Sequence, residues 1–110
     1  MEWVELAYLY DLALRLDVPT CAKLAGEYFK EYLEVVSLQD VDEEPLPEVV
    51  SMAYNLSEND RTLCDPLIKW ICDWWNADDV EKHRSCMEAC VKESAAFAVD
   101  LLIAEIDYIC

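Results

Sequence analysis

The residues best suited to chemistry in this 110-residue chain are one histidine and two cysteines in its C-terminal third. His83, Cys86 and Cys90 are spaced i, i+3 and i+7, which places all three on one face of a helix. Imidazole and thiolate groups suit zinc, and a fourth ligand would have to come from another of the six cysteines. The paired CxxC knuckles of strong zinc motifs are absent. Two buried thiols beside a surface histidine are therefore the competing interpretation.

Other patterns that could support catalysis are weak. A cysteine and a histidine can form a nucleophile and its base, but the only glycine, Gly26, sits inside a helical pattern. No glycine-lined loop for an oxyanion or a phosphate follows from such a sequence. Asp40, Asp42 and Glu44 alternate as in a calcium loop, but no glycine follows them and Pro45 intrudes. We therefore expect a non-enzymatic protein without a cofactor, with a small zinc or redox domain as the alternative.

Charge and composition exclude several classes of partner. Eight Lys and Arg residues against 24 Asp and Glu residues give a formal charge of −16, which repels nucleic-acid phosphates and anionic membranes. The uncharged runs are shorter than the roughly 18 to 20 residues that span a bilayer. Glu2 and Glu5 follow Met1 without a basic and apolar leader. We expect an intracellular protein, cytoplasmic or nuclear, whose cysteines are reduced.

Apolar residues recur at helical spacing along most of the chain and predict an all-α fold. The expected object is one compact domain over residues 1–110, a bundle of five to six helices without strands. An acidic connector is expected over 37–47, Thr20 and Ser94 are candidate N-caps, and Pro66 should lie in a first helical turn. The expected helices cover residues 2–17, 20–36, 47–56, a segment from 60–65 to 75, 79–92 and 95–108.

The first two expected helices have different apolar patterns. The second carries the clearest stripe of the chain: Cys21, Leu24, Ala25, Tyr28, Phe29, Tyr32, Leu33 and Val36. The first is apolar on most sides, far more than a surface helix requires, so it should need cover from a partner or from its own neighbours. We expect protein contacts, to a partner or to a second copy, through helix faces. The predicted contact residues are Trp3, Tyr8, Leu12 and Trp75.

Two stretches resemble a known family. Residues 6–25 with Tyr28-Phe29-Lys30, and Pro47-Glu48-Val49-Val50 followed by Tyr54-Asn55 and by 57–65, are similar in order and spacing to fungal BTB/POZ-domain proteins. The resemblance covers about residues 6 to 75, and more loosely the helix from Ala95 to Ile106. Leu14 and Leu16 stand where the family has an acid and a tyrosine, and Cys64 stands where it has an arginine.

The resemblance implies a division of the chain and a function. Residues 1–37 would correspond to the last helices of a BTB domain and residues 46–110 to its helical C-terminal extension, with the β-rich core absent from this sequence. It implies a protein–protein interaction module, a scaffold or a fragment of a ubiquitin-ligase adaptor that docks on a cullin-type partner. The wide apolar surface of the first helix would then be the side that such a core covers.

Overall fold

The described part of the chain is helical, as the spacing of its apolar residues predicts. The computed structural model describes residues 2–36, 42–56, 60–77 and 84–109, and it describes the backbone alone for 74–77 and 105–109. These residues contain six helices and no strand. The helices are α1 (Trp3–Arg15), α2 (Pro19–Val35), α3 (Leu46–Tyr54), α4 (Cys64–Ala77), α5 (Arg84–Glu93) and α6 (Ala95–Ile109).

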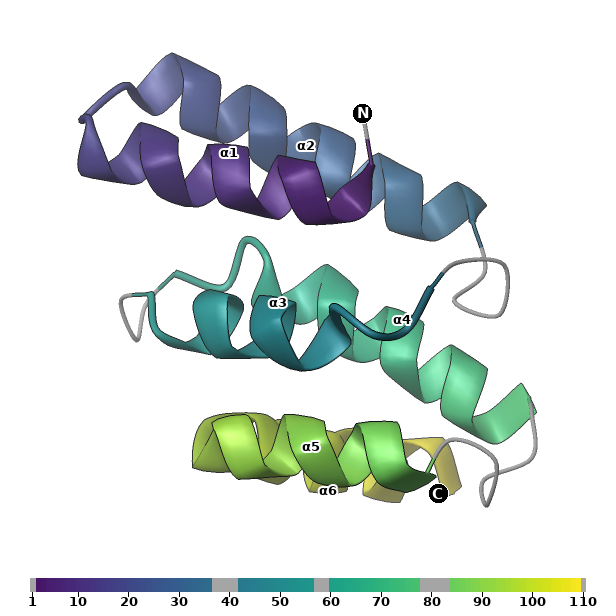
Figure 1. The fold of residues 1–110 in the computed structure, drawn as a ribbon. Coiled ribbons are helices and arrows are strands. Elements are labelled where there is room, and N and C mark those ends of the chain that lie inside the picture. The colour runs from purple at the N-terminus through teal and green to yellow at the C-terminus, as the bar shows by residue number, and fades with distance from the viewer. Residues whose placement is uncertain (1, 37–41, 57–59, 78–83, 110) are drawn as a thin grey trace.

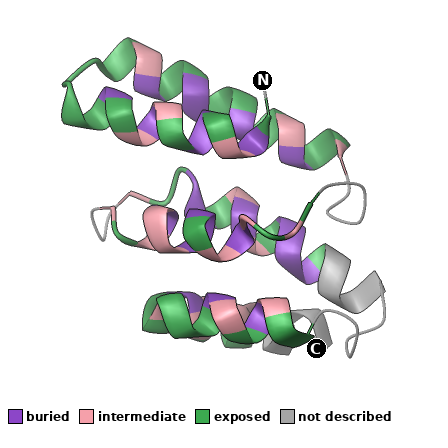
Figure 2. Cartoon of the chain, viewed as in Figure 1, coloured by how far each residue is buried: buried purple, intermediate pink, exposed green. Residues whose placement is uncertain are grey.

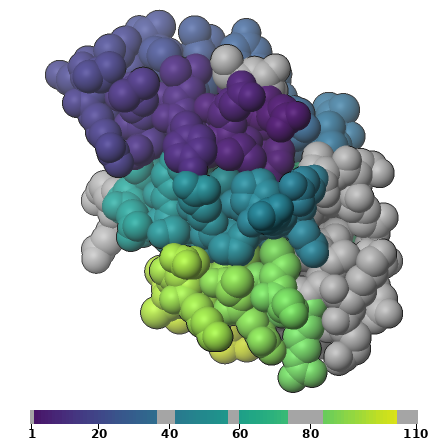
Figure 3. Space-filling model, viewed as in Figure 1, coloured from purple at the N-terminus to yellow at the C-terminus, as the bar shows by residue number. Residues whose placement is uncertain are grey.

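The helices are stacked as three layers of two (Figure 1). The antiparallel hairpin of α1 and α2 forms the first layer, α3 and α4 form the second, and α5 and α6 form the third. Across the layers, α3 packs on α1 and α5, while α4 packs on α2 and α6. The space-filling view in Figure 3 shows α1, α3 and α5 as three successive bands. The radius of gyration of 13.6 Å is that of a single compact domain of this length, and the predicted all-α bundle is confirmed.

The middle layer holds the centre of the core. Buried residues are concentrated in α3 and in the described part of α4, whereas α1, α2 and α5 alternate between buried and exposed residues (Figure 2). Phe29 reaches this core from the first layer, and Phe97 and Cys90 reach it from the third. The fully buried residues of the middle layer are Leu46, Val49, Val50, Leu63, Leu67 and Ile71.

The turn between α1 and α2 closes on a residue in the left-handed region. Asp17 has φ 56°. Its N–H donates to the carbonyl of Leu14 at 3.2 Å, and the N–H of Val18 donates to the carbonyl of Ala13 at 2.9 Å. These two bonds form a Schellman motif, in which glycine is the usual residue at the left-handed position. Aspartate is tolerated there because its side chain is short and polar.

Helix boundaries follow the predictions with one correction. Thr20 is not the N-cap of α2: the helix begins at Pro19, because the fixed φ of proline suits the first helical position and its missing N–H has no partner to lose there. Ser94 caps α6 as predicted, since its hydroxyl accepts the N–H of Phe97 at 3.2 Å. Pro66 lies in the first turn of α4. Of the acidic connector expected over 37–47, residues 37–41 lie outside the described part of the chain.

Candidate interaction site

Trp3, predicted as a contact for a partner, lies in the core. It is 2% exposed, and its ring meets the ring of Trp70 edge to face, with centroids 5.1 Å apart. The indole N–H of Trp70 donates to the carbonyl of Val36 at 2.7 Å, which holds this pair against the end of α2. The expected exposure of Trp3 is therefore wrong. A helix that is apolar on most sides does not reveal which side turns inward, and here the aromatic pair joins α1 to α4.

Tyr8 and Leu12 lie on the surface of α1, as predicted. Leu12 is 51% exposed. Tyr8 is also exposed, and its hydroxyl donates to the carboxylate of Glu48 on α3. This hydrogen bond to a negative group raises the pKa of Tyr8. Trp75, the fourth predicted contact, belongs to α4, and its side chain lies outside the described residues.

A larger apolar surface includes Leu12 and extends over both helices of the first layer. Leu16, the C-cap residue of α1, is four residues after Leu12 and continues the same side of the helix. On α2 the exposed apolar residues also follow a helical spacing, and Val35 at its end is 84% exposed. Partly buried Leu9, Cys21 and Tyr32 occupy the same sides of the two helices, close to the seam between them. We call this surface the hairpin face, and it consists of Leu12, Leu16, Leu24, Tyr28 and Val35.

The sequence predicted only part of the hairpin face, because Leu12 is its one residue among the predicted contacts. Leu24 and Tyr28 belong to the clearest apolar stripe, yet they are exposed, because that stripe is wider than the surface that the neighbouring helices cover. Leu16, 65% exposed, precedes the turn. The sequence did contain a sign of this surface. The apolar arc of each of the two helices is wider than the roughly 100° that one core contact needs.

Charges around the hairpin face are acidic. Exposed Glu5 lies on the same side of α1 as Leu12, exposed Glu31 lies between Tyr28 and Val35 on α2, and Asp17 occupies the turn. The basic residues of these helices point elsewhere. Arg15 pairs with Asp11 at 3.0 Å, and the two lysines of α2 line a cleft on another side. The surface therefore combines an apolar centre with an acidic rim.

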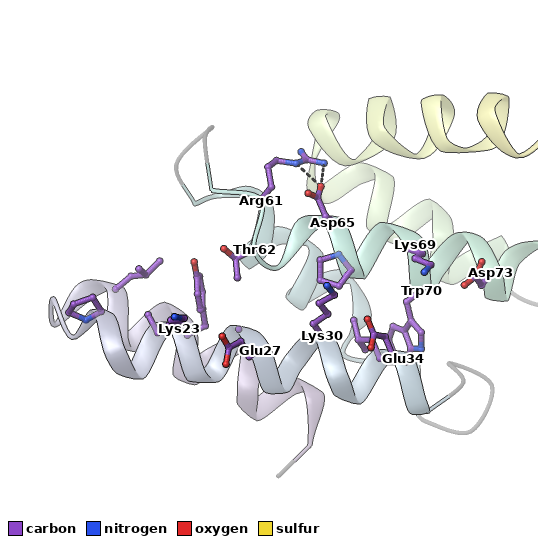
Figure 4. Close-up of a pocket in the computed structure, with 17 residues that line it drawn as sticks. Lys23, Glu27, Lys30, Glu34, Arg61, Thr62, Asp65, Lys69, Trp70 and Asp73 are labelled. Carbon is purple, nitrogen blue, oxygen red and sulfur yellow. Dashed lines mark hydrogen bonds and ion pairs between the residues drawn. The ribbon is translucent and has the colours of Figure 1, made fainter.

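The cleft lies between α2 and α4 and has a volume of about 1230 Å³. Tyr10 and Trp70 are among its lining residues, and the hydroxyl of Tyr10 donates to Asp60 at 2.7 Å. Four of the chain's eight basic residues line it, each followed by an acid four positions later (Figure 4). These pairs are Lys23 and Glu27, Lys30 and Glu34, Arg61 and Asp65, and Lys69 and Asp73. Because the charges balance, the cleft has no net attraction for an anion.

Arg61 also anchors the third layer. Its guanidinium donates to Asp100 of α6 at 2.7 Å and to Asp65 at 2.9 Å, and Tyr54 donates to the same Asp100 oxygen at 2.7 Å. Burial, followed by the hydrogen bond to Asp100, raises the pKa of Tyr54. Burial also raises the pKa of the neighbouring Cys64 thiol to about 11, and this thiol donates to the carbonyl of Ala53 at 3.2 Å. These groups are held protonated and structural at neutral pH.

The predicted zinc ligands are only partly described. His83 lies outside the described residues. Cys86 and Cys90 are hydrogen-bonded thiols on α5, which lowers the pKa of Cys86 and raises that of fully buried Cys90. Within residues 2–36, 42–56, 60–77 and 84–109, no three His, Cys, Asp or Glu side chains are grouped to hold a metal. The five cysteines in this part of the chain are free thiols.

Comparison with known proteins gives no relative. No family model, no curated protein and no solved structure matches the chain. Among the described helices, none has both the length and the apolar composition needed to cross a membrane.

Proposed function

We propose that this protein is a non-enzymatic interaction module whose hairpin face binds another protein. The observation that carries the proposal is the set of large apolar side chains, Leu12, Leu16, Leu24, Tyr28 and Val35, exposed on one side of a hairpin whose opposite side is packed in the core. Scattered exposed apolar residues are ordinary, but a contiguous group marks an interaction surface. These Leu side chains are about half exposed, so covering each one should contribute about 1 kcal/mol.

The acidic rim of the hairpin face indicates what kind of protein would bind there. Glu5, Asp17 and Glu31 surround the apolar centre, and no lysine or arginine of α1 or α2 is directed to it. A partner that places an apolar patch inside a ring of basic residues would match this surface in shape and in charge. The net charge of −16 would add long-range attraction to such a partner and would make binding sensitive to salt.

The resemblance to fungal BTB/POZ proteins gives the proposal its finer form. The first two helices would be the last helices of a BTB domain, followed by the helical extension, in a scaffold or an adaptor of a ubiquitin ligase. The antiparallel α1–α2 hairpin joined at the Pro19 break supports this reading, because the hairpin exposes one apolar side that a further domain could cover.

Catalysis and zinc binding have less support. Cys64 and Cys90 have raised pKa values, and a thiol held protonated is a poor nucleophile, whereas the pKa of Cys86 is lowered. The zinc or redox alternative rests on His83, Cys86 and Cys90, and elemental analysis of the purified protein tests it.

The test of the proposal is site-specific photo-crosslinking followed by a binding measurement. A photoreactive phenylalanine analogue is placed at Leu16 or Leu24 of the full chain in cells of its source organism, and at exposed Ser85 of α5 as the control position. A protein captured from both hairpin positions but not from Ser85 is then purified and titrated with the chain. We expect Leu16→Asp and Leu24→Asp to raise the Kd about tenfold or more, because a carboxylate would be desolvated in the interface.

The matched control is Val99→Asp, the same kind of change at an exposed aliphatic residue of the third layer, which should leave this Kd unchanged. The Kd of the unaltered chain should rise with ionic strength. Equal capture from Ser85 and from the hairpin positions would overturn the proposal. A Kd that neither Leu16→Asp nor Leu24→Asp changes would also overturn it.

A further inference from the structure

Helix α6 does not have the usual pattern of a surface helix, which is apolar on one side and polar on the other. Phe97 on its inner side is fully buried, yet its outer side is also apolar. The only charged residue between positions 95 and 104 is Asp100, and it is turned toward Tyr54 and Arg61. A helix that is apolar on both sides is normally covered on both. The exposed residues, which we call the α6 face, are Ala95, Ala96, Val99, Leu102 and Ile103.

The absence of charge on the α6 face favours a second copy of this chain as its binding partner. A chain with a net charge of −16 is repelled by copies of itself wherever carboxylates would meet. The hairpin face has an acidic rim and is unsuited to self-pairing, whereas the five residues of the α6 face are all uncharged. Asp100, the one ionisable residue from 95 to 104, is held by Tyr54 and Arg61. Two copies could therefore pack these five residues together without placing a carboxylate between them.

The residue sizes on the α6 face are self-complementary. Relative to Val99, the residues three and four positions earlier are the small Ala96 and Ala95, and those three and four positions later are the large Leu102 and Ile103. If two α6 helices cross antiparallel on a two-fold axis at Val99, each pair of alanines faces the large side chains of the other copy. Alanines also allow the close interhelical distances of packed helices, about 8 Å.

We propose that a second copy of this chain packs on the α6 face, forming a two-fold symmetric dimer centred on Val99. This dimer uses a different layer from the hairpin face, so a partner and a second copy can bind at the same time. Failure of either proposal leaves the other standing.

The test is sedimentation equilibrium of the purified full chain over a concentration series. The unaltered chain should pass reversibly from its 12.7 kDa monomer to a species of twice that mass. Val99→Asp and Val99→Lys should each raise the dimer Kd about tenfold or more, because like charges would meet at the axis. An equimolar mixture of these two variants should restore dimerisation, because the axis would then join opposite charges. Leu16→Asp, on the hairpin face, should leave the dimer Kd unchanged.

Several results would overturn the dimer. A chain that stays monomeric up to about 1 mM, the range of weak association, would show that a second copy does not cover α6. A dimer insensitive to Val99→Asp and Val99→Lys, or one that their mixture does not restore, would place the contact elsewhere. If either variant loses its helical circular dichroism signal, Leu102→Gln on the same face takes its place and should also weaken the dimer.

Discussion

Gly26 lies directly against Thr62. A Cβ atom added at Gly26 would be 2.6 Å from Cγ2 of Thr62 and 3.4 Å from the ring of Tyr10. The only glycine of the chain therefore serves close packing and not a turn, because α2 meets the segment before α4 at this point.

Gly26→Ala should destabilise the protein, although alanine is the better helix former by about 1 kcal/mol. The clash with the Thr62 methyl group should exceed that gain and leave a net loss of about 1 kcal/mol in the free energy of unfolding. The control is Thr62→Ser, which removes the methyl group and keeps the hydroxyl. In that background Gly26→Ala should become stabilising, as measured by urea unfolding. The same effect of Gly26→Ala in both backgrounds would contradict the packing argument.

Asp17→Gly should stabilise the protein. Asp17 holds the left-handed position of the Schellman motif at φ 56°, and a non-glycine residue there costs about 1–2 kcal/mol. Glycine has more freedom to lose on folding, so we expect a net gain of about 0.5–1 kcal/mol in thermal unfolding. Asp73→Gly, the same change at an exposed position of α4, is the control and should destabilise by a similar amount. A loss of stability in Asp17→Gly would contradict the turn geometry.

Truncation of Trp3 should cost far more stability than truncation of Leu12. Trp3→Ala removes the ring that packs on Trp70 and should cost about 3–5 kcal/mol of unfolding free energy. Leu12→Ala, nine residues later on the same helix, should change the free energy by no more than about 0.5 kcal/mol, because its side chain is exposed. Guanidinium unfolding of both variants distinguishes them. Equal losses would mean that α1 is turned differently from the structure described above.

Stability should fall as the pH rises from 9 to 11. Burial raises the pKa of the Cys64 thiol from 9.0 to about 11, so the folded state favours the protonated thiol. The stabilisation is present below pH 9 and is lost as the pH rises through 11, because the unfolded chain loses this proton first. Cys64→Ala should flatten this part of the profile of unfolding free energy against pH. Profiles of equal slope in wild type and Cys64→Ala would contradict the assignment.

The purified protein should contain only substoichiometric zinc. Among the described residues no three His, Cys, Asp or Glu side chains are grouped to hold a metal, so Cys86 and Cys90 would depend on His83 and one further ligand. Elemental analysis of protein purified without chelators measures this directly. Stoichiometric zinc that disappears in His83→Ala would establish the metal-binding alternative instead.

Much of the fold could be predicted from periodicity and local signals. Six helices, the Ser94 cap and the position of Pro66 depend on neighbours within a few residues, which the sequence displays. The contact of Gly26 with Thr62 joins positions 36 apart, and the left-handed Asp17 depends on how two helices must turn to pack. Neither leaves a local pattern in the sequence.

The candidate site was less predictable, for a related reason. Leu12 and Trp3 are both apolar residues on a helix that is apolar on most sides, and the packing of Trp3 on Trp70 decides between them. On α6, the sequence predicted the helix but not that Asp100 turns inward and leaves Val99 outside. Long-range hydrogen bonds from Tyr54 and Arg61 fix that rotation.

The most direct test of the central claim, that another polypeptide covers the hairpin face, is hydroxyl-radical footprinting read by mass spectrometry. Oxidation of Leu16, Leu24 and Tyr28 is compared between the purified chain and the same chain in freshly opened cells, with exposed Leu14 at the cleft as the internal reference. We predict that the three hairpin residues are oxidised several-fold more slowly in the cell extract, while Leu14 reacts at the same rate in both. Equal rates at all four residues would contradict the claim.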